Sequence, residues 1–129
     1  MRSACLIVGV GFDLVDVNEL QTNVDQQPEE WLERVFTVAE RTYSSQQPDP
    51  YRSFAGTLAA KEAALKALGT GWTDHSDWQD VEVIRECERP LLVMRGAVLE
   101  LSKRLKVVRS FVSISHTKDH AGAVVILEI

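Results

Sequence analysis

The chain lacks most features of secreted, membrane-bound and thiolate-metal proteins. Its 129 residues include two cysteines, Cys5 and Cys87, which have no metal-binding or redox spacing. No apolar run approaches the roughly 20 residues that cross a bilayer. The apolar stretch near the N-terminus is short and contains glycines and Asp13, unlike a signal peptide. We therefore expect reduced thiols, no membrane association and a cytoplasmic location.

An excess of positive charge is also missing. The net charge is −5, which argues against a general nucleic-acid binder. Internal repeats and low-complexity tracts are absent as well. Hydrophobic residues make up 45% of the chain and charged residues 26%, a balance typical of a globular protein. We expect one domain covering residues 1–129, long enough to bury a core.

Turn residues divide the chain into a mixture of strands and helices, which predicts an α+β fold with a mainly antiparallel sheet. Apolar and small residues alternate over residues 6–13, and two glycines leave the Asp13 face of this strand open to close approach. Capping signals predict a helix that begins after Thr37. The further strands are expected at 81–84, 91–94, 107–116 and 121–129, and the helices at 18–24, from 28, at 37–44, at about 50–68 and at 97–105.

The long helix at about 50–68 carries charges among alanines and leucines. At about 100° per residue, Lys61 falls within the apolar stripe, and Glu62 and Lys66 lie together on its flank. A lysine among leucines is costly unless its amine reaches water or an anion. We therefore expect this helix to present charge at a packed boundary, as a site for a phosphate-bearing ligand and a metal requires.

Asp13 and Glu62 are candidate ligands for a hard metal ion. Each also has a simpler explanation, because Asp13 suits a turn and Glu62 suits an i,i+4 ion pair with Lys66. Two carboxylates do not fill the shell of Mg²⁺, but substrate phosphates and waters can complete it. A site of that kind performs phosphoryl transfer.

The segment from Ser113 to Thr117 lies where a strand meets a loop. Ser113 and Ser115 are expected on one face of the strand and His116 on the other. A serine hydrolase triad is disfavoured, because Ser115 is not in a strained elbow between flanking glycines. His116 is either a turn residue or a hydrogen-bond donor to a phosphate.

Three segments together resemble one protein family. They are residues 8–15 (VGVGFDLV), 54–71 (FAGTLAAKEAALKALGTG) and 113–117 (SISHT). The combination resembles the short holo-[acyl-carrier-protein] synthases, the small class of the 4′-phosphopantetheinyl transferase superfamily, in order over nearly the whole chain. The resemblance implies the fold of that superfamily and a Mg²⁺-dependent reaction. In that reaction, the phosphopantetheine arm of coenzyme A is transferred to a serine of an apo acyl carrier protein, and adenosine 3′,5′-bisphosphate is released.

The resemblance also implies roles for particular residues. Asp13 and Glu62 match the metal-binding carboxylates of the family and, with Lys66, its catalytic group. The positions that match coenzyme-binding residues are Lys61, Lys66, Ser115, His116 and Thr117. Relatives of this size are homotrimers with sites at subunit interfaces, so Asp13 and Glu62 of one subunit are expected to face His116 of its neighbour. The proton acceptor stays open between Glu62 and a metal-bound water.

Two positions depart from the family pattern. Thr57 and Glu19 stand where relatives carry arginines that face the coenzyme phosphates and the acidic carrier, respectively. A non-catalytic coenzyme-A-binding or carrier-docking module of the same fold is therefore the alternative, and a small Mg²⁺-dependent phosphohydrolase is a third hypothesis. The sequence leaves open whether the carrier serves fatty-acid, polyketide or peptide assembly.

Overall fold

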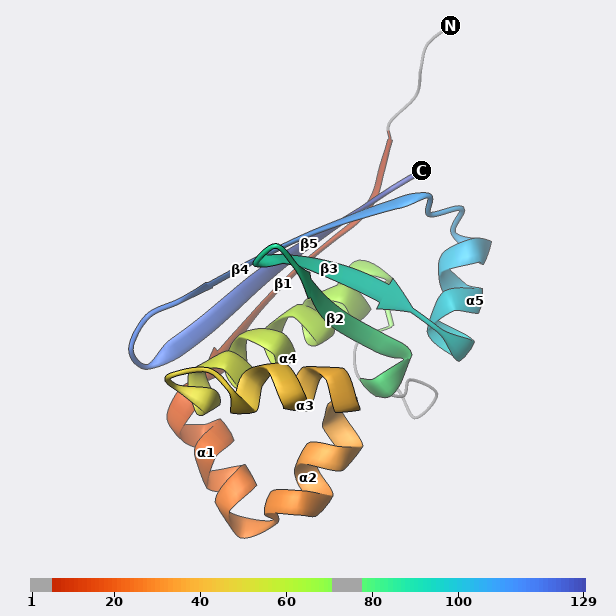
Figure 1. The fold of residues 1–129 in the computed structure, drawn as a ribbon. Coiled ribbons are helices and arrows are strands. Elements are labelled where there is room, and N and C mark those ends of the chain that lie inside the picture. The colour runs from red at the N-terminus through yellow and green to blue at the C-terminus, as the bar shows by residue number, and fades with distance from the viewer. Residues whose placement is uncertain (1–5, 71–77) are drawn as a thin grey trace, which may run out of the picture.

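The computed structural model describes residues 6–70 and 78–129, and its ribbon is drawn in Figure 1. The strands are β1 (Ile7–Asp16), β2 (Val81–Glu86), β3 (Arg89–Met94), β4 (Arg109–His116) and β5 (His120–Glu128). The helices are α1 (Val17–Gln26), α2 (Pro28–Val35), α3 (Val38–Ser45), α4 (Pro50–Ala67) and α5 (Gly96–Arg104), with a 3₁₀ turn at Trp78–Asp80. The α+β class is confirmed.

The strands form two antiparallel sheets. One has three strands in the order β1-β5-β4, and the other is the β2-β3 hairpin. The hairpin turns at Cys87 and Glu88, which both have positive φ. Cys87 is an exposed free thiol, whereas Cys5 lies outside the described residues. Part of the polar loop expected after the long helix, residues 71–77, also lies outside them.

Helix α4 lies between the three-stranded sheet and the other N-terminal helices (Figure 1). The side chain of Asp49 caps its first turn, Pro50 is its first residue, and Gly69 follows its end with φ +83°. These boundaries confirm the predicted helix. Its buried surface is wider than one apolar stripe, because the alanines of α4 pack against β5 while Phe54 and Leu58 face the helices α1 and α2.

Two glycines bring β1 into contact with the backbone of α4. A Cβ atom on Gly9 would lie 1.9 Å from the carbonyl oxygen of Ala67, and one on Gly11 would lie 1.8 Å from that of Ala63. No other residue type fits there without moving the strand or the helix. The close approach expected on the Asp13 face of β1 is therefore made by α4, and it places Asp13 beside that helix.

The opposite face of the three-stranded sheet is apolar and open. On β1, Val10, Phe12 and Leu14 are each about 60% exposed, and Phe111 on β4 is half exposed. The strand register places Val124 of β5 beside Phe12. We call this surface the outer sheet face. Large exposed apolar patches on soluble proteins commonly lie at association sites.

Among the described residues, no helix has the length and apolar character that crossing a bilayer requires.

Candidate active site

Asp13, Glu62 and Lys66 meet at the β1 edge of the sheet. The Lys66 ammonium donates a hydrogen bond of 2.7 Å to Asp13 Oδ1 and one of 3.3 Å to the carbonyl oxygen of Phe12. Glu62 lies one turn before Lys66 on α4. Lys66 therefore forms its ion pair with Asp13 on β1, and this pair joins the helix to the strand. It does not form the i,i+4 ion pair with Glu62 within the helix. The sequence predicted these three residues as a group, and the structure brings them together.

The charge balance of this group is unusual. The pKa of Glu62 is raised from 4.5 to about 8, mainly by burial and then by the neighbouring carboxyl group of Asp13, while Lys66 opposes the rise. The hydrogen bond to Asp13 raises the pKa of Lys66, so this side chain stays cationic. With a pKa of about 8, Glu62 is largely protonated at neutral pH, and Lys66 pairs with Asp13. An additional cation would stabilise the ionised form of Glu62.

The same group fits a divalent metal. Asp13 Oδ2 is buried and accepts no hydrogen bond from the described residues, so it is free to act as a ligand. Glu62 supplies a second oxygen from another element. Within residues 6–70 and 78–129, no group of three or more potential metal-ligating side chains occurs. A hard cation would therefore need substrate phosphates and waters to complete its shell.

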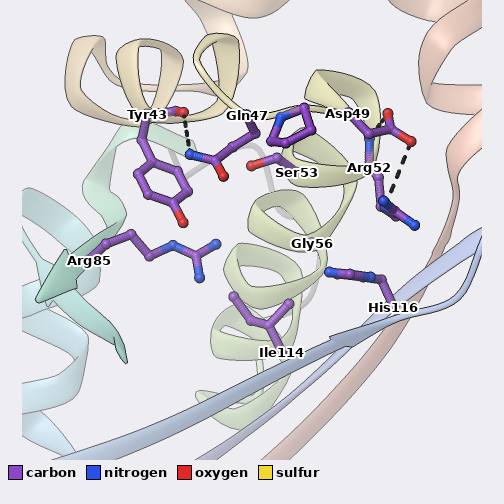
Figure 2. Close-up of a pocket in the computed structure, with 10 residues that line it drawn as sticks. Tyr43, Gln47, Asp49, Arg52, Ser53, Gly56, Arg85, Ile114 and His116 are labelled. Carbon is purple, nitrogen blue, oxygen red and sulfur yellow. Dashed lines mark hydrogen bonds and ion pairs between the residues drawn. The ribbon is translucent and has the colours of Figure 1, made fainter. Parts of the chain in front are cut away.

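His116 lies in a cavity of about 220 Å³ at the β4 edge of the sheet (Figure 2). Its imidazole and the guanidinium group of Arg85 approach this cavity from opposite sides, with Ile114 and Gly56 between them. The wall formed by α3, α4 and the segment that joins them consists of Tyr43, Gln47, Pro48, Asp49, Arg52, Ser53 and Gly56. Arginines and an imidazole facing one cavity suit an anionic ligand.

Ser115 and Thr117 lie at a second cavity, of about 290 Å³, which opens on the outer sheet face. Phe12 and Leu14 line the same cavity. Alternation along β4 separates the side chains as predicted: Ser113 and Ser115 line the outer cavity, and Ile114 lines the cavity at the β4 edge. His116 borders both cavities.

Asp13 and His116 lie at opposite edges of the sheet, because β5 runs between β1 and β4. Helix α4 covers the inner face between them (Figure 1). Within one chain, a ligand that contacts both residues from this side would have to pass α4.

Lys61 does not lie with the other predicted site residues. It is fully buried in α4, and its amine donates a hydrogen bond of 2.6 Å to Glu40 Oε1. The same carboxylate accepts hydrogen bonds from the backbone N–H groups of Thr37 and Val83. The expectation that Lys61 faces phosphate is therefore at odds with this structure, since the anion that satisfies it comes from the chain itself.

Sequence patterns did not point to Arg85, Tyr43 or Glu40 as functional residues. Arg85 lies near the end of a strand and Tyr43 within a helix, and neither belongs to a recognisable motif. Glu40 was recognised as the partner of Thr37 in the capping box, which the structure confirms. Its second role, in pairing with Lys61, depends on a contact between residues 21 positions apart.

Comparisons with known proteins agree with this architecture. The model of the 4′-phosphopantetheinyl transferase superfamily matches residues 9–125. The chain belongs to this superfamily. A holo-[acyl-carrier-protein] synthase of Solibacter usitatus (strain Ellin6076) is 35% identical over 124 residues, which are 95% of this chain and 99% of the relative.

Solved structures of holo-[acyl-carrier-protein] synthases share the fold. The Helicobacter pylori protein, in complex with coenzyme A, superposes with a TM-score of 0.81 at 26% identity, covering 92% of this chain and 98% of that one. The Bacillus anthracis protein, with a bound ligand described as CoA (3′,5′-ADP), gives 0.78 at 31% identity, covering 96% and 98%. The predicted family, fold and enzyme class, a transferase of the holo-[acyl-carrier-protein] synthase type, are confirmed.

Proposed function

We propose that this protein transfers the 4′-phosphopantetheine group of coenzyme A to a serine of an apo acyl carrier protein. The observation that carries the proposal is the group at the β1 edge. There, Asp13 presents a buried oxygen without a hydrogen-bond donor, Glu62 presents a second carboxyl group, and Lys66 supplies a cation. Family membership supports the same activity.

In this reaction, the serine oxygen attacks the phosphorus atom that bears the pantetheine arm. The bond to the bridging oxygen of the diphosphate breaks, and adenosine 3′,5′-bisphosphate leaves with that oxygen. The serine proton passes to a base, for which Glu62 and a water remain the two candidates. The chain's own contribution is to hold the diphosphate beside Lys66 and to keep the attacking and leaving oxygens in line.

Asp13 and Glu62 are the residues that we propose to hold Mg²⁺. When bound, the ion neutralises charge on the diphosphate and stabilises the leaving phosphate. Lys66 keeps Asp13 in place through its hydrogen bond of 2.7 Å and adds positive charge next to the same substrate group. Asp13, Glu62 and Lys66 are accordingly the proposed catalytic residues.

The adenosine end of coenzyme A is proposed to occupy the cavity at the β4 edge that contains His116. Ser115 and Thr117 line the neighbouring cavity on the outer sheet face, which His116 also borders, and they are proposed to contact the coenzyme from that side. Since Asp13 and His116 occupy opposite edges of one sheet, we further propose that each site combines the β1 edge of one subunit with the β4 edge of another. The exposed outer sheet face supports association of several copies, which we propose to be a homotrimer.

The acceptor is proposed to reach Glu62 through a groove of about 190 Å³ between α1 and α4. Asp16, Glu19 and Asn23 of the α1 region line this groove together with Glu62. Glu19 repels an acidic carrier and slows its association. A carrier with less negative charge beside its serine is therefore proposed to be the better partner. The proposed location of this reaction is the cytoplasm.

The test is mass spectrometry of apo acyl carrier proteins after incubation with the protein, coenzyme A and Mg²⁺. We expect a carrier mass increase of one phosphopantetheine group, abolished by Asp13→Ala and kept by Glu29→Ala, which removes an exposed carboxylate on α2. Coenzyme binding without transfer to any carrier would instead indicate a binding module. Coenzyme hydrolysis without a carrier would indicate a phosphohydrolase.

A further inference from the structure

The buried ion pair of Lys61 and Glu40 ties α4 to two other elements. Both side chains are fully buried, and the Lys61 amine lies 2.6 Å from Glu40 Oε1. The same oxygen accepts a hydrogen bond of 2.9 Å from the backbone N–H of Thr37. Glu40 Oε2 accepts one of 2.7 Å from the backbone N–H of Val83 on β2. Backbone groups from two segments thus hold the carboxylate in place for the amine of α4.

A second set of hydrogen bonds anchors this carboxylate from the other side. The Thr37 hydroxyl accepts a hydrogen bond from the backbone N–H of Glu40 and donates one to the Glu82 carboxylate. Arg95, just before α5, donates a hydrogen bond of 2.7 Å to the other oxygen of Glu82. The acceptor of the Lys61 amine therefore belongs to a frame made by α3, β2 and the start of α5, and it does not move with α4.

Stability alone is a poor explanation for a buried ion pair. Two charges lose their water, and apolar side chains of similar volume often stabilise a protein as well or better. The ion pair instead adds direction, because it is satisfied only at a particular distance and orientation. On the side that packs against β5, the buried surface of α4 has short side chains, which form shallow ridges. They are Ala59, Ala60, Ala63, Ala64 and Ala67.

Glu62 follows Lys61 directly in α4, so the ion pair also controls where the Glu62 side chain points. Successive side chains of an α-helix are about 100° apart around its axis. With Lys61 held toward α3 and β2, Glu62 lies at the groove beside α1, where its carboxyl group neighbours that of Asp13. The glycines of β1 determine how closely strand and helix approach, and the ion pair determines how the helix is rotated.

We propose that the ion pair of Lys61 with Glu40 positions the proposed metal site by fixing the rotation of α4, which carries Glu62. Lys61 and Glu40 are thereby positioning residues, which act without touching coenzyme or metal. The inference rests on the proposed function, because it takes Asp13 and Glu62 as the residues that hold Mg²⁺. It gives a reason for a lysine within the apolar stripe of α4.

The test compares the wild type with the double variant Glu40→Gln with Lys61→Met, in which neither charge is left without its partner. In transfer assays, we expect kcat to fall about tenfold or more and the Mg²⁺ concentration for half-maximal rate to rise about tenfold. Val98→Ala removes buried methyl groups on α5 and controls for lost stability. It should keep both values within about twofold of the wild type, because a purely structural defect lowers the folded fraction without changing the Mg²⁺ requirement.

Electron paramagnetic resonance of Mn²⁺, with adenosine 3′,5′-bisphosphate present, tests the ion pair without a carrier. The double variant should bind Mn²⁺ about tenfold more weakly than the wild type, and Val98→Ala should bind it equally well. Glu40→Asp, which keeps the charge and shortens the side chain by one methylene group, is a milder second variant and should also weaken binding.

The two measurements separate the positioning role from the proposed function. Weakened Mn²⁺ binding in the variants, together with no transfer by the wild type, would uphold the positioning role and refute the proposed function. Active transfer with wild-type Mg²⁺ requirement and Mn²⁺ affinity in both the double variant and Glu40→Asp would refute the positioning role alone. A wild type that binds no Mn²⁺ would also overturn it.

Discussion

Glu62 lies where burial and a second carboxyl group oppose its ionisation. Its pKa of about 8 in the folded chain is well above the 4.5 of a free glutamate. Between these values, the folded chain holds a proton that the unfolded chain releases. The free energy of unfolding therefore falls as the pH rises from about 4.5 to 8, and the contribution of Glu62 is constant above and below this window.

Replacing Glu62 by glutamine should remove this pH dependence. We expect the unfolding free energy of Glu62→Gln, measured with urea in the presence of EDTA, to fall less than that of the wild type between pH 5 and 8. Glutamine keeps the shape of the side chain but never ionises. Glu29→Gln, on the exposed start of α2, should follow the wild type. Parallel curves for Glu62→Gln and the wild type would contradict the raised pKa.

Thr57 stands where the resemblance places an arginine, and in the structure it is buried in α4 with 2% of its surface exposed. Threonine brings no charge to the cavity beside Gly56. The cations at this cavity come instead from Arg52, on the first turn of α4, and from Arg85 on β2. The missing arginine is thus compatible with an anion-binding cavity, because residues from other elements provide the charge.

The packing of β1 on α4 positions Asp13 opposite Glu62 and Lys66. Gly9 and Gly11 make this packing possible, since a methyl group at either position would overlap a carbonyl oxygen of α4. The alignment of the proposed catalytic group therefore depends on two glycines, which have no side chain.

Gly11→Ala should destabilise the protein by about 3 kcal/mol or more, at the upper end of overpacking costs. It should also weaken activity in the molecules that remain folded, because Asp13 moves with its strand. Gly122→Ala on β5 is the matched control, since its added methyl group would meet the tip of the Leu14 side chain at 3.1 Å. Thermal melts and transfer assays on both variants measure the difference. Equal melting temperatures for the two would refute the close-packing argument.

Glu40 lies on α3 and links this helix to α4 and to β2. Its carboxylate accepts hydrogen bonds from Lys61 on α4, from the N–H group of Thr37 before α3 and from the N–H group of Val83 on β2. Lys61 and Glu40 are both buried, so each charge depends on the other. Because β2 and α3 also carry Arg85 and Tyr43, this ion pair holds two walls of the cavity at the β4 edge together.

Glu40→Gln should cost about 3–5 kcal/mol of unfolding free energy, the usual penalty for leaving one member of a buried ion pair without its partner. Adding Lys61→Met removes the stranded cation and should recover part of the loss. Urea unfolding of the two single variants and the double variant forms the thermodynamic cycle. A double variant as unstable as the sum of the single changes would contradict direct pairing.

The molecule as a whole has candidate site residues at both edges of one sheet and an uncovered apolar face on that sheet. The proposed association of copies would remove Val10, Phe12 and Leu14 from water and bring the β1 edge of one copy to the β4 edge of another. A chain of 129 residues can then form an extended cleft without a second domain.

Val10→Glu tests this assembly, since a charge in the middle of the outer sheet face is costly to bury. We expect the wild type to sediment as a trimer and the variant as a monomer with unchanged circular dichroism and little transfer activity. Val38→Glu is the control, because Val38 is 70% exposed on α3 and lies away from the sheet. A wild type that sediments as a monomer, or a fully active monomeric variant, would overturn the proposed shared site.

Much of the fold and part of the site were accessible from sequence patterns. The capping box at Thr37, the start of α4 after Asp49 and the alternation of β4 all depend on residues close together in the chain. Local chemistry determines such features, so local patterns predict them. The meeting of Asp13 with Glu62 was expected from the glycines of β1 and from the resemblance.

The tertiary structure decided the features that depend on distant contacts. Lys61 was correctly predicted to lie in the buried stripe, but only the fold shows that Glu40 satisfies its charge. Likewise, the stacking of Arg85 on Tyr43 joins a hairpin to a helix, and no pattern in either segment encodes it. The sequence by itself determined the elements and the family, and it singled out Asp13, Glu62 and Lys66 as the candidate site. The packing of those elements decided which charges are balanced within the core and which remain free for a ligand. The physical reason is that two residues far apart in the sequence can pair only where the fold brings their side chains within contact distance.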